Sequence, residues 1–158
     1  MIKDSGERRE FETGAVRDIQ TGKGRCDLLP LDVVAKMFLP NKMLSNIFRS
    51  INEFMHDKNC EWLVASVRSF CEYMDWDIST AIIEVSQHFE EGAKKYVERN
   101  WEKGINVHCY IDSGIRHLLK HIRGDVDERH DRAFIWNMMC ATWTCIHKPE
   151  LIDIPDLD

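Results

Sequence analysis

One predicted helix, over residues 79–99, carries four residues that could take part in chemistry. Glu84, His88, Glu91 and Lys95 are spaced four, three and four residues apart. Residues at this spacing stack along one face of a helix, opposite its apolar stripe. The simpler interpretation is a solvated face on which Glu91 and Lys95 form a helical ion pair. The alternative is a face that contributes carboxylates to a functional site.

Three further carboxylates begin a helix predicted over 127–146. On a helical wheel Asp127 and Asp131 fall near the apolar stripe of that helix, and Glu128 falls on its flank. Inward-pointing charge is costly unless it is paired or bound to a metal ion. Carboxylates from two neighbouring helices form an oxygen-ligand site for Mg²⁺ or Mn²⁺. Acidic residues at a helix N-terminus also stabilise the helix dipole, so the pattern alone leaves both interpretations open.

Two histidines give a weaker metal signal. His117 and His121 are four residues apart, as zinc-binding histidines often are. The HExxH signature of zinc hydrolases is absent, so the spacing by itself does not predict a zinc site.

Cationic and aromatic side chains accompany these carboxylates. They are Lys94, Lys95, Tyr96, Arg99, Asn100, Trp101, Arg116, His117 and Lys120. A nucleobase can stack on Trp or Tyr, and Arg and Lys can hold phosphates. Carboxylates for a metal ion, cations for phosphate and an aromatic ring for a base together indicate a nucleotide ligand.

The N-terminal stretch TGAVRDIQTGKGRCDLLP is rich in glycine and charge. It favours an ordered loop with one short strand or turn, although a flexible N-terminal arm is an equal alternative. In an ordered loop, Arg17, Lys23 and Arg25 would contact phosphate together with glycine amides. The tetrapeptide GKGR lacks the spacing of a P-loop, so no P-loop is predicted.

Helices are the elements expected to position these residues, because no proline lies between 41 and 148. They are predicted over 31–39, 42–56, 60–74, 79–99, a segment that ends near Gly124, and 127–146. Ser79 or Thr80 is the expected N-cap of the long helix, and residues 100–108 are the expected loop. The fold class is therefore all-α, a helical bundle with an irregular N-terminal arm.

The length of 158 residues fits a single domain, 1–158. Within it we expect a loop-rich arm over 1–30, a helical core over 31–148 and a C-terminal tail over 149–158. The last helix is apolar around most of its circumference, which indicates burial in the core or in a subunit interface. One domain of this length does not readily bury both sides, so we expect a homo-oligomer, either a dimer or a tetramer.

Composition excludes several classes of protein. The formal net charge of −6 argues against binding a nucleic acid polymer, which needs a basic face. Apolar runs are too short to span a membrane, and the charged N-terminus is not a signal peptide. Six cysteines without CxxC spacing are expected to be reduced and mostly buried, although an even number also permits disulfides. The expected location is the cytoplasm, or the host cytoplasm if a phage encodes the chain.

The segments EEGAKKYVERNWEKG and YIDSGIRHLLKHIRGDVDERH, with the following WN, resemble the phage-type dATP/dGTP diphosphohydrolase family. TGAVRDIQTGKGRCDLLP and IDIPDLD are similar to the same family, and residues 41–78 are a gap in the resemblance. The family is related to the all-α nucleoside triphosphate pyrophosphohydrolases of MazG type. The resemblance implies hydrolysis of a purine deoxynucleoside triphosphate, dGTP or dATP, to the monophosphate and pyrophosphate.

The resemblance also implies a mechanism, in which water attacks the α-phosphorus with the help of Mg²⁺ or Mn²⁺. MazG-type enzymes pair an ExxE helix with an ExxD helix. Glu128 and Asp131 fit ExxD, but Gln87 follows Glu84 where ExxE requires an acid. The expected metal ligands are Glu84, Glu91, Asp127, Glu128 and Asp131. Glu84 or Glu91 is the expected general base.

Substrate-binding residues follow from the same resemblance. The expected set is Lys23, Arg25, Lys95, Tyr96, Asn100, Trp101, Arg116 and His117. Within it, Lys95, Arg116 and either Lys23 or Arg25 hold the phosphates, and Trp101 or Tyr96 stacks on the base. The main alternative is a protein that sequesters a nucleotide without turnover. A helical interaction module, with neither metal nor nucleotide affinity, is a third alternative.

Overall fold

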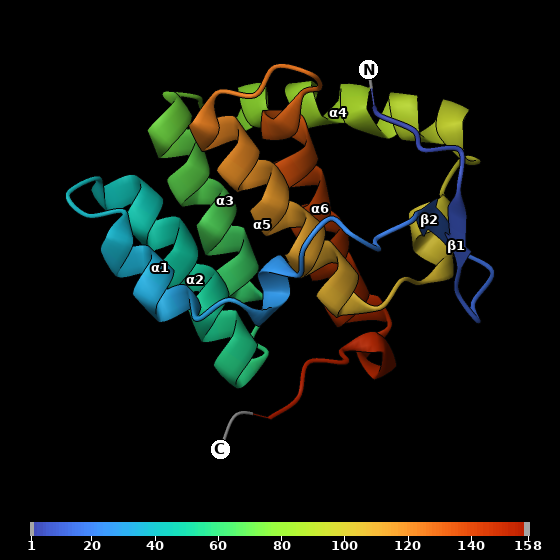
Figure 1. Ribbon diagram of the computed structural model, residues 1–158, viewed down its shortest axis with the longest axis horizontal. Helices are drawn as coiled ribbons and strands as arrows, with labels where there is room; N and C mark the ends of the chain where they lie inside the picture. The colour runs from blue at the N-terminus through green and yellow to red at the C-terminus, as the bar shows by residue number, and fades with distance from the viewer. Residues whose placement is uncertain (1, 157–158) are drawn as a thin grey trace.

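Helices make up most of the computed structural model, which describes residues 2–156 (Figure 1). The helices are α1 (Leu31–Met37), α2 (Lys42–Asp57), α3 (Glu61–Met74), α4 (Ile78–Lys95), α5 (Val107–Arg123) and α6 (His130–His147). Short 3₁₀ helices are η1 (Cys26–Leu28), η2 (Asn100–Lys103) and η3 (Pro149–Leu151), and the strands are β1 (Arg8–Glu10) and β2 (Val16–Asp18). The predicted all-α bundle is confirmed.

Helix α6 lies at the centre of the bundle and packs against α3, α4 and α5 (Figure 1). Phe134 and Met138 are buried on one side of it and Cys140 on another, which explains its apolar residues around most of the circumference. Helices α5 and α6 approach closely at Gly114, where an added Cβ would lie 2.5 Å from Met138 Cε and 3.2 Å from Asn137 Cβ. A larger residue at this position would push the two helices apart.

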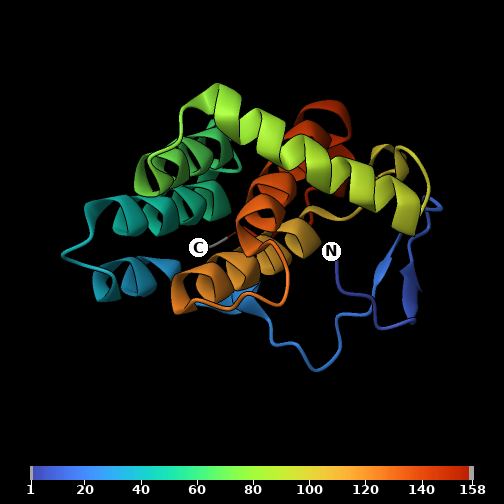
Figure 2. The same ribbon diagram turned by 90° about the horizontal axis from the view of Figure 1, so that it is seen from above.

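Helix α4 crosses over α6, and the small β-hairpin stands at its C-terminal end, remote from α1 and α2 (Figure 2). The N-cap of α4 is Asp77, whose carboxylate accepts the backbone N–H of Thr80 at 2.8 Å. The prediction of Ser79 or Thr80 as N-cap is therefore wrong, because Asp77 has the extended backbone that a capping residue needs. The helix also ends four residues before the predicted Arg99.

The start of α6 differs from the prediction as well. The helix begins at His130, so Asp127 and Glu128 lie in the preceding loop. Arg129 has a non-helical backbone (φ −82°, ψ 80°), and the side chain of Asp127 accepts a hydrogen bond from the His130 ring at 2.7 Å. The loop predicted over 100–108 is shorter, because η2 and the first turn of α5 occupy part of it.

Residues before α1 form a hairpin and a long connection, where the sequence predicted one short strand or turn. Strands β1 and β2 pair antiparallel, with Arg9 directly opposite Arg17. Gly14 closes the turn at φ 86°, a conformation that favours glycine, and its N–H donates to the Phe11 carbonyl at 2.9 Å. Phe11 and Ala15 are buried, so the hairpin is anchored to the rest of the structure.

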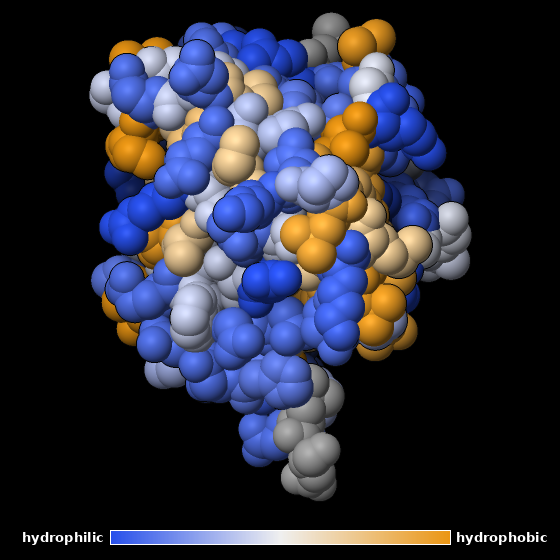
Figure 3. Space-filling model, turned by 90° about the vertical axis from the view of Figure 1, so that its left-hand side faces the viewer, coloured by the Kyte–Doolittle hydropathy of each residue, from blue (hydrophilic) through white to orange (hydrophobic). Residues whose placement is uncertain are grey.

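Surface and cysteine chemistry agree with the sequence analysis. None of the described helices is long and apolar enough to cross a membrane. All six cysteines are free thiols, four of them buried, as predicted. The face on the side of α1 and α2 is mostly hydrophilic with separate apolar patches (Figure 3).

Candidate functional site

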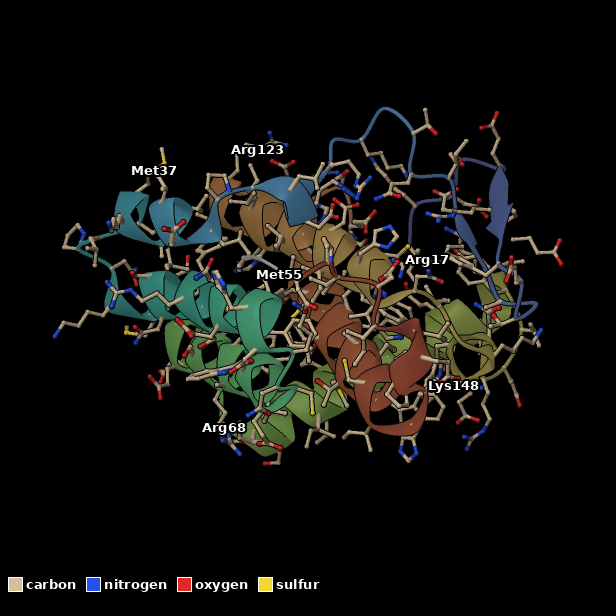
Figure 4. All side chains as sticks on the ribbon, turned by 90° about the horizontal axis from the view of Figure 1, so that it is seen from below. Arg17, Met37, Met55, Arg68, Arg123 and Lys148 are labelled. Atoms are coloured by element: carbon tan, nitrogen blue, oxygen red, sulfur yellow. The ribbon has the colours of Figure 1, made fainter. Side chains whose placement is uncertain are left out.

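A cavity of about 540 Å³ lies between the N-terminal segment and the helices. Its wall is formed by the hairpin and the connection after it, the C-terminal half of α4, η2, α5 and α6. Cavities of this size accommodate small-molecule ligands and cofactors. Figure 4 shows Arg17 where the hairpin meets the helices.

The lining of this cavity is positively charged, although the chain as a whole carries a net charge of −6. Among the described residues, eight lining residues are Lys or Arg and four are Asp or Glu. The cations are Lys3, Arg9, Arg17, Lys23, Lys95, Arg99, Arg116 and Lys120, and the acids are Asp4, Asp18, Asp112 and Glu128. A concave surface with a net charge of one sign concentrates ligands of the opposite sign, so the cavity is suited to an anion.

Arg9 and Arg17 face each other across the hairpin, and both line the cavity. Like charges directly opposite in an antiparallel pair destabilise the pair. Arg17 Nη2 donates to Asn137 Oδ1 at 3.2 Å, and its guanidinium lies over the rings of Tyr110 and Trp136 at 5.1 and 5.7 Å. Its buried Nη1 has no hydrogen-bond partner among the described residues. An anion in the cavity would relieve the repulsion between the two arginines.

Asp112 fixes the connection after the hairpin to α5. Its carboxylate, 1% exposed, accepts the backbone N–H of Cys26 at 2.6 Å, Arg116 Nη2 at 2.7 Å and the side-chain amide of Gln20. Arg116 also donates to the carbonyl of Gly24 at 3.2 Å. Arg116, predicted to hold phosphate, therefore lines the cavity while its charge is paired with Asp112.

Asn100 and Tyr96 fix β2 in the same way. Asn100 Oδ1 accepts the N–H of Val16 at 2.9 Å, and its Nδ2 donates to the Val16 carbonyl at 2.8 Å. The Tyr96 hydroxyl accepts the N–H of Asp18 at 3.1 Å. Both residues line the cavity, but their polar atoms hold the strand that carries Arg17.

Aromatic rings form one wall of the cavity. Trp101 meets Phe89 edge-on at 5.7 Å, and Trp136 lies 5.5 Å from the ring of His88. Burial, with further contributions from the nearby charges of Arg132 and Arg17, lowers the pKa of His88 to about 4. His88 is therefore neutral near neutral pH and belongs to the aromatic wall.

The cavity brings together most of the predicted substrate-binding residues. Those that line it are Lys23, Lys95, Tyr96, Asn100, Trp101, Arg116 and His117. Arg25 is not among the lining residues and forms an ion pair with Asp27 at 2.6 Å. Of the predicted metal ligands, Glu128 lines the cavity.

The other predicted metal ligands lie outside the lining. Glu84 forms ion pairs with Arg132 at 2.6 Å and Arg129 at 3.2 Å, and Arg129 also pairs with Asp131 at 2.8 Å. Burial raises the pKa of Asp131, but hydrogen bonds from Arg129 and a backbone N–H outweigh it, so the pKa lies below its usual value. Glu91 is half-buried on α4. The structure thus joins Glu84 and Asp131 through an arginine.

A histidine and carboxylate cluster borders the cavity between α5 and α6. His117 Nδ1 lies 2.9 Å from His130 Nδ1 and 3.6 Å from Glu128 Oε1. His130 Nε2 lies 2.7 Å from Asp127 Oδ1. Hydrogen bonds from Lys3 and His130 hold the pKa of Asp127 well below its usual range. One ligand atom each from His117, Glu128 and His130 lies within 4.8 Å of the others, so these residues have the spacing of a metal site.

Several site residues were not assigned from the sequence. Arg9, Asp112 and Trp136 line the cavity, and His130 belongs to the cluster. Alternation within the hairpin could have indicated Arg9, because strand pairing places it beside Arg17. His117 and His130 are thirteen residues apart on two helices, and no local spacing relates them.

Comparison with known proteins gives one match, to a family. No curated protein and no solved structure matches the chain. The sequence profile of one family, described as dATP/dGTP diphosphohydrolase, N-terminal, matches residues 72–154, which is more than half of the chain. The matched region includes α4, α5 and α6, which carry most of the helical residues of the cavity and the histidine cluster. The chain therefore belongs to the dATP/dGTP diphosphohydrolase family.

Proposed function

We propose that this protein hydrolyses dGTP, dATP or both to the deoxynucleoside monophosphate and pyrophosphate. One observation carries the proposal: a cavity of net positive charge, in an acidic chain of this family, is lined by two arginines that lie opposite each other. A triphosphate supplies negative charge and acceptor oxygens to these two arginines. The cavity has room for a nucleoside as well.

The phosphates are held by cations whose side chains reach the cavity from the hairpin and α4. Arg9, Arg17 and Lys95 are the main candidates, because Arg116 is paired with Asp112 and Lys23 pairs with Asp18 at 3.2 Å. Arginine binds phosphate oxygens in a bidentate manner, which orients the chain of phosphates as well as neutralising it.

The base stacks on Trp101. Of the two predicted stacking residues, Tyr96 already has Arg8 over its ring at 5.1 Å and the Lys95 ammonium at 5.2 Å. Trp101 is half-buried in the cavity wall and makes edge-on contacts with Phe89 and Trp143. A base that enters the cavity can stack on an indole in this wall.

We propose Mg²⁺ or Mn²⁺ as the cofactor, which neutralises charge on the triphosphate and lowers the pKa of water. Glu128 is the ligand that the geometry supports best, because it is the one predicted acid among the lining residues. Asp127, Asp131 and Glu84 are paired with Lys3, Arg129 and Arg132, so of the predicted ligands we retain Glu128 and Glu91. Glu84 or Glu91 stays the predicted general base. In this proposal Arg17 and Lys95 hold the phosphates while a carboxylate accepts the proton of the attacking water.

We further propose that residues 1–158 act as one domain. The arm over 1–30 closes the cavity against the core over 31–148, through the contacts of Asp112 and Asn100. In the predicted tail over 149–158, Asp153 accepts the backbone N–H of His108 at 3.0 Å and so braces the start of α5.

Product analysis tests this function. Each of the eight common nucleoside triphosphates is incubated with the protein and Mg²⁺ or Mn²⁺, and products are separated by ion-exchange chromatography. We expect dGMP or dAMP with pyrophosphate, and the control Arg49→Gln, exposed on α2, should behave as wild type. Orthophosphate with a nucleoside diphosphate would contradict the reaction. Tight nucleotide binding without turnover would favour the sequestering protein.

A further inference from the structure

The cluster of His117, Glu128 and His130 has the geometry of a metal site that contains nitrogen ligands. The Nδ1 atoms of His117 and His130 are 2.9 Å apart, and Glu128 Oε1 is 3.6 Å from His117 Nδ1. Two nitrogens bound about 2.0–2.1 Å from one ion lie roughly 3 to 3.4 Å apart at octahedral or tetrahedral angles. The separations of 2.9 and 3.6 Å lie close to that range, and all three ligand atoms lie within 4.8 Å of one another, so one ion can reach the three residues with small side-chain movements.

Asp127 supports this cluster from outside. Its Oδ1 lies 2.7 Å from His130 Nε2, the ring nitrogen that does not face His117. A metal-binding histidine commonly donates its second N–H to a carboxylate, which fixes the ring and directs the other nitrogen to the metal. Lys3 pairs with the second oxygen of Asp127 at 2.6 Å. The carboxylate is thereby oriented towards His130.

The cluster is buried yet reachable. The side chain of His130 is 1% exposed, whereas His117 and Glu128 line the cavity. The ligand atoms therefore lie in a position of low dielectric, next to the space proposed for the triphosphate. An ion enters through the cavity and needs no opening of the bundle.

We propose that His117, Glu128 and His130 bind one first-row transition-metal ion, with Asp127 positioning His130. Two imidazoles and one carboxylate favour Mn²⁺, Co²⁺ or Zn²⁺ over Mg²⁺, which prefers oxygen ligands and retains its water. The ligand set therefore differs from the all-carboxylate set expected from the sequence. This site would supply the metal ion of the proposed function. Binding of the ion does not depend on that function, and only its role in catalysis rests on it.

Calorimetry on the nucleotide-free protein tests the site, with Mg²⁺, Mn²⁺ and Co²⁺ as probes. Affinity should rise from Mg²⁺ to Mn²⁺ to Co²⁺. His117→Gln and Glu128→Gln should each weaken Mn²⁺ binding by about 100-fold or more, and Asp127→Asn by about 10–100-fold. His56→Gln, exposed on α2, is the matched control and should bind as wild type. Wild-type Mn²⁺ affinity in both His117→Gln and Glu128→Gln would overturn the site.

Pulsed electron paramagnetic resonance of bound Mn²⁺ gives a second measurement that does not depend on folding of a variant. The wild-type protein should show coupling to imidazole nitrogen, and bound Mn²⁺ without nitrogen coupling would overturn the site. Nitrogen coupling in a protein that hydrolyses no nucleotide would support the metal site and contradict the proposed function. Hydrolysis by a protein whose bound Mn²⁺ shows no nitrogen coupling would support the proposed function and contradict the metal site.

Discussion

Arg17 has the contacts that best support phosphate binding in the cavity. It faces Arg9, donates to Asn137 and keeps a buried nitrogen without a partner among the described residues. A hydrogen bond to a charged group contributes about 1.5–3 kcal/mol, so Arg17→Gln should lower kcat/KM for dGTP by roughly 10- to 150-fold. The melting temperature should stay the same or rise, because the repulsion with Arg9 is removed.

Steady-state kinetics and thermal melting of the same sample check this prediction. Arg49→Gln removes one exposed positive charge from α2 and serves as the control for net charge. Unchanged kcat/KM in Arg17→Gln would show that the phosphates lie elsewhere. A large fall in melting temperature would show that Arg17 is chiefly a structural residue.

Glu128 and Asp131 have different surroundings in the structure, although both belong to the ExxD pattern. Glu128 lines the cavity beside His117, whereas Asp131 is paired with Arg129 at the start of α6. Glu128→Gln should reduce turnover by about two orders of magnitude or more with little change in metal-free stability. Asp131→Asn should cost about 0.5–2 kcal/mol of stability and keep most of the turnover.

The comparison needs the rate of pyrophosphate release and the melting temperature, each with and without Mn²⁺. An equal loss of turnover in the two variants would indicate that Asp131 binds the metal ion as well. Near wild-type turnover in Glu128→Gln would remove Glu128 from them.

At the scale of elements, the C-terminal tail stabilises the start of α5, the helix that carries Asp112, Arg116 and His117. Asp153 accepts hydrogen bonds from the His108 ring, the His108 backbone and Asn106 Nδ2. The Asp153 carboxylate raises the pKa of His108 from 6.5 to about 10. Burial raises the pKa of Asp153, but the hydrogen bonds from His108 outweigh it and leave the pKa at about 2.

These shifts predict how stability depends on pH. Because the folded pKa of His108 is raised, its contribution is complete below pH 6.5 and is lost as pH rises towards about 10. His108→Gln should lower the free energy of unfolding by about 1–2 kcal/mol near pH 6. The difference from wild type should shrink towards zero at about pH 10, as measured by urea unfolding at several pH values. His56→Gln is the control, and a difference that is constant with pH would contradict the ion pair.

Much of the helical architecture could be predicted from the sequence, because a helix that buries one face needs apolar residues at helical spacing. The segments 42–56 and 60–74 match α2 and α3 to within one residue at each end, and Gly124 ends α5 at φ 92° as expected. The start of α6 could not be predicted, because DERHD has no apolar periodicity and its backbone follows side-chain hydrogen bonds.

The site was predictable in part for a similar reason. Lys95, Tyr96, Asn100 and Trp101 are close in sequence, so their grouping at the end of α4 follows from local spacing. The pairing of Glu84 with Arg132 depends on how α4 crosses α6, which local spacing does not determine. The same holds for the meeting of His117 and His130 between α5 and α6.

At the scale of the whole molecule, an apolar groove of about 520 Å³ lies between α3, α4 and α6. Ile82 and Ile146 line it and are 54% and 59% exposed, and Trp143 lines it as well. Exposed apolar surface of this kind is typical of subunit interfaces. We therefore expect this groove to be the interface of the predicted homo-oligomer, a dimer or a tetramer.

Light scattering at micromolar concentration tests the assembly. The wild-type protein should be a dimer or tetramer, and Ile82→Asp and Ile146→Asp should shift it towards the monomer, because a charge in an apolar interface is costly to desolvate. Val33→Asp changes an exposed apolar residue of α1 outside the groove, and should leave the assembly unchanged. A wild-type monomer would contradict the prediction.

The proposed reaction is hydrolysis at the α-phosphorus of a purine deoxynucleoside triphosphate, in the cavity of net positive charge between the hairpin and α4, α5 and α6. Hydrolysis of dGTP or dATP in water enriched with oxygen-18 tests it most directly, with mass spectrometry of both products. Attack at the α-phosphorus places the solvent oxygen in the monophosphate and leaves pyrophosphate unlabelled. Label in pyrophosphate, or in orthophosphate released from the substrate, would contradict the account.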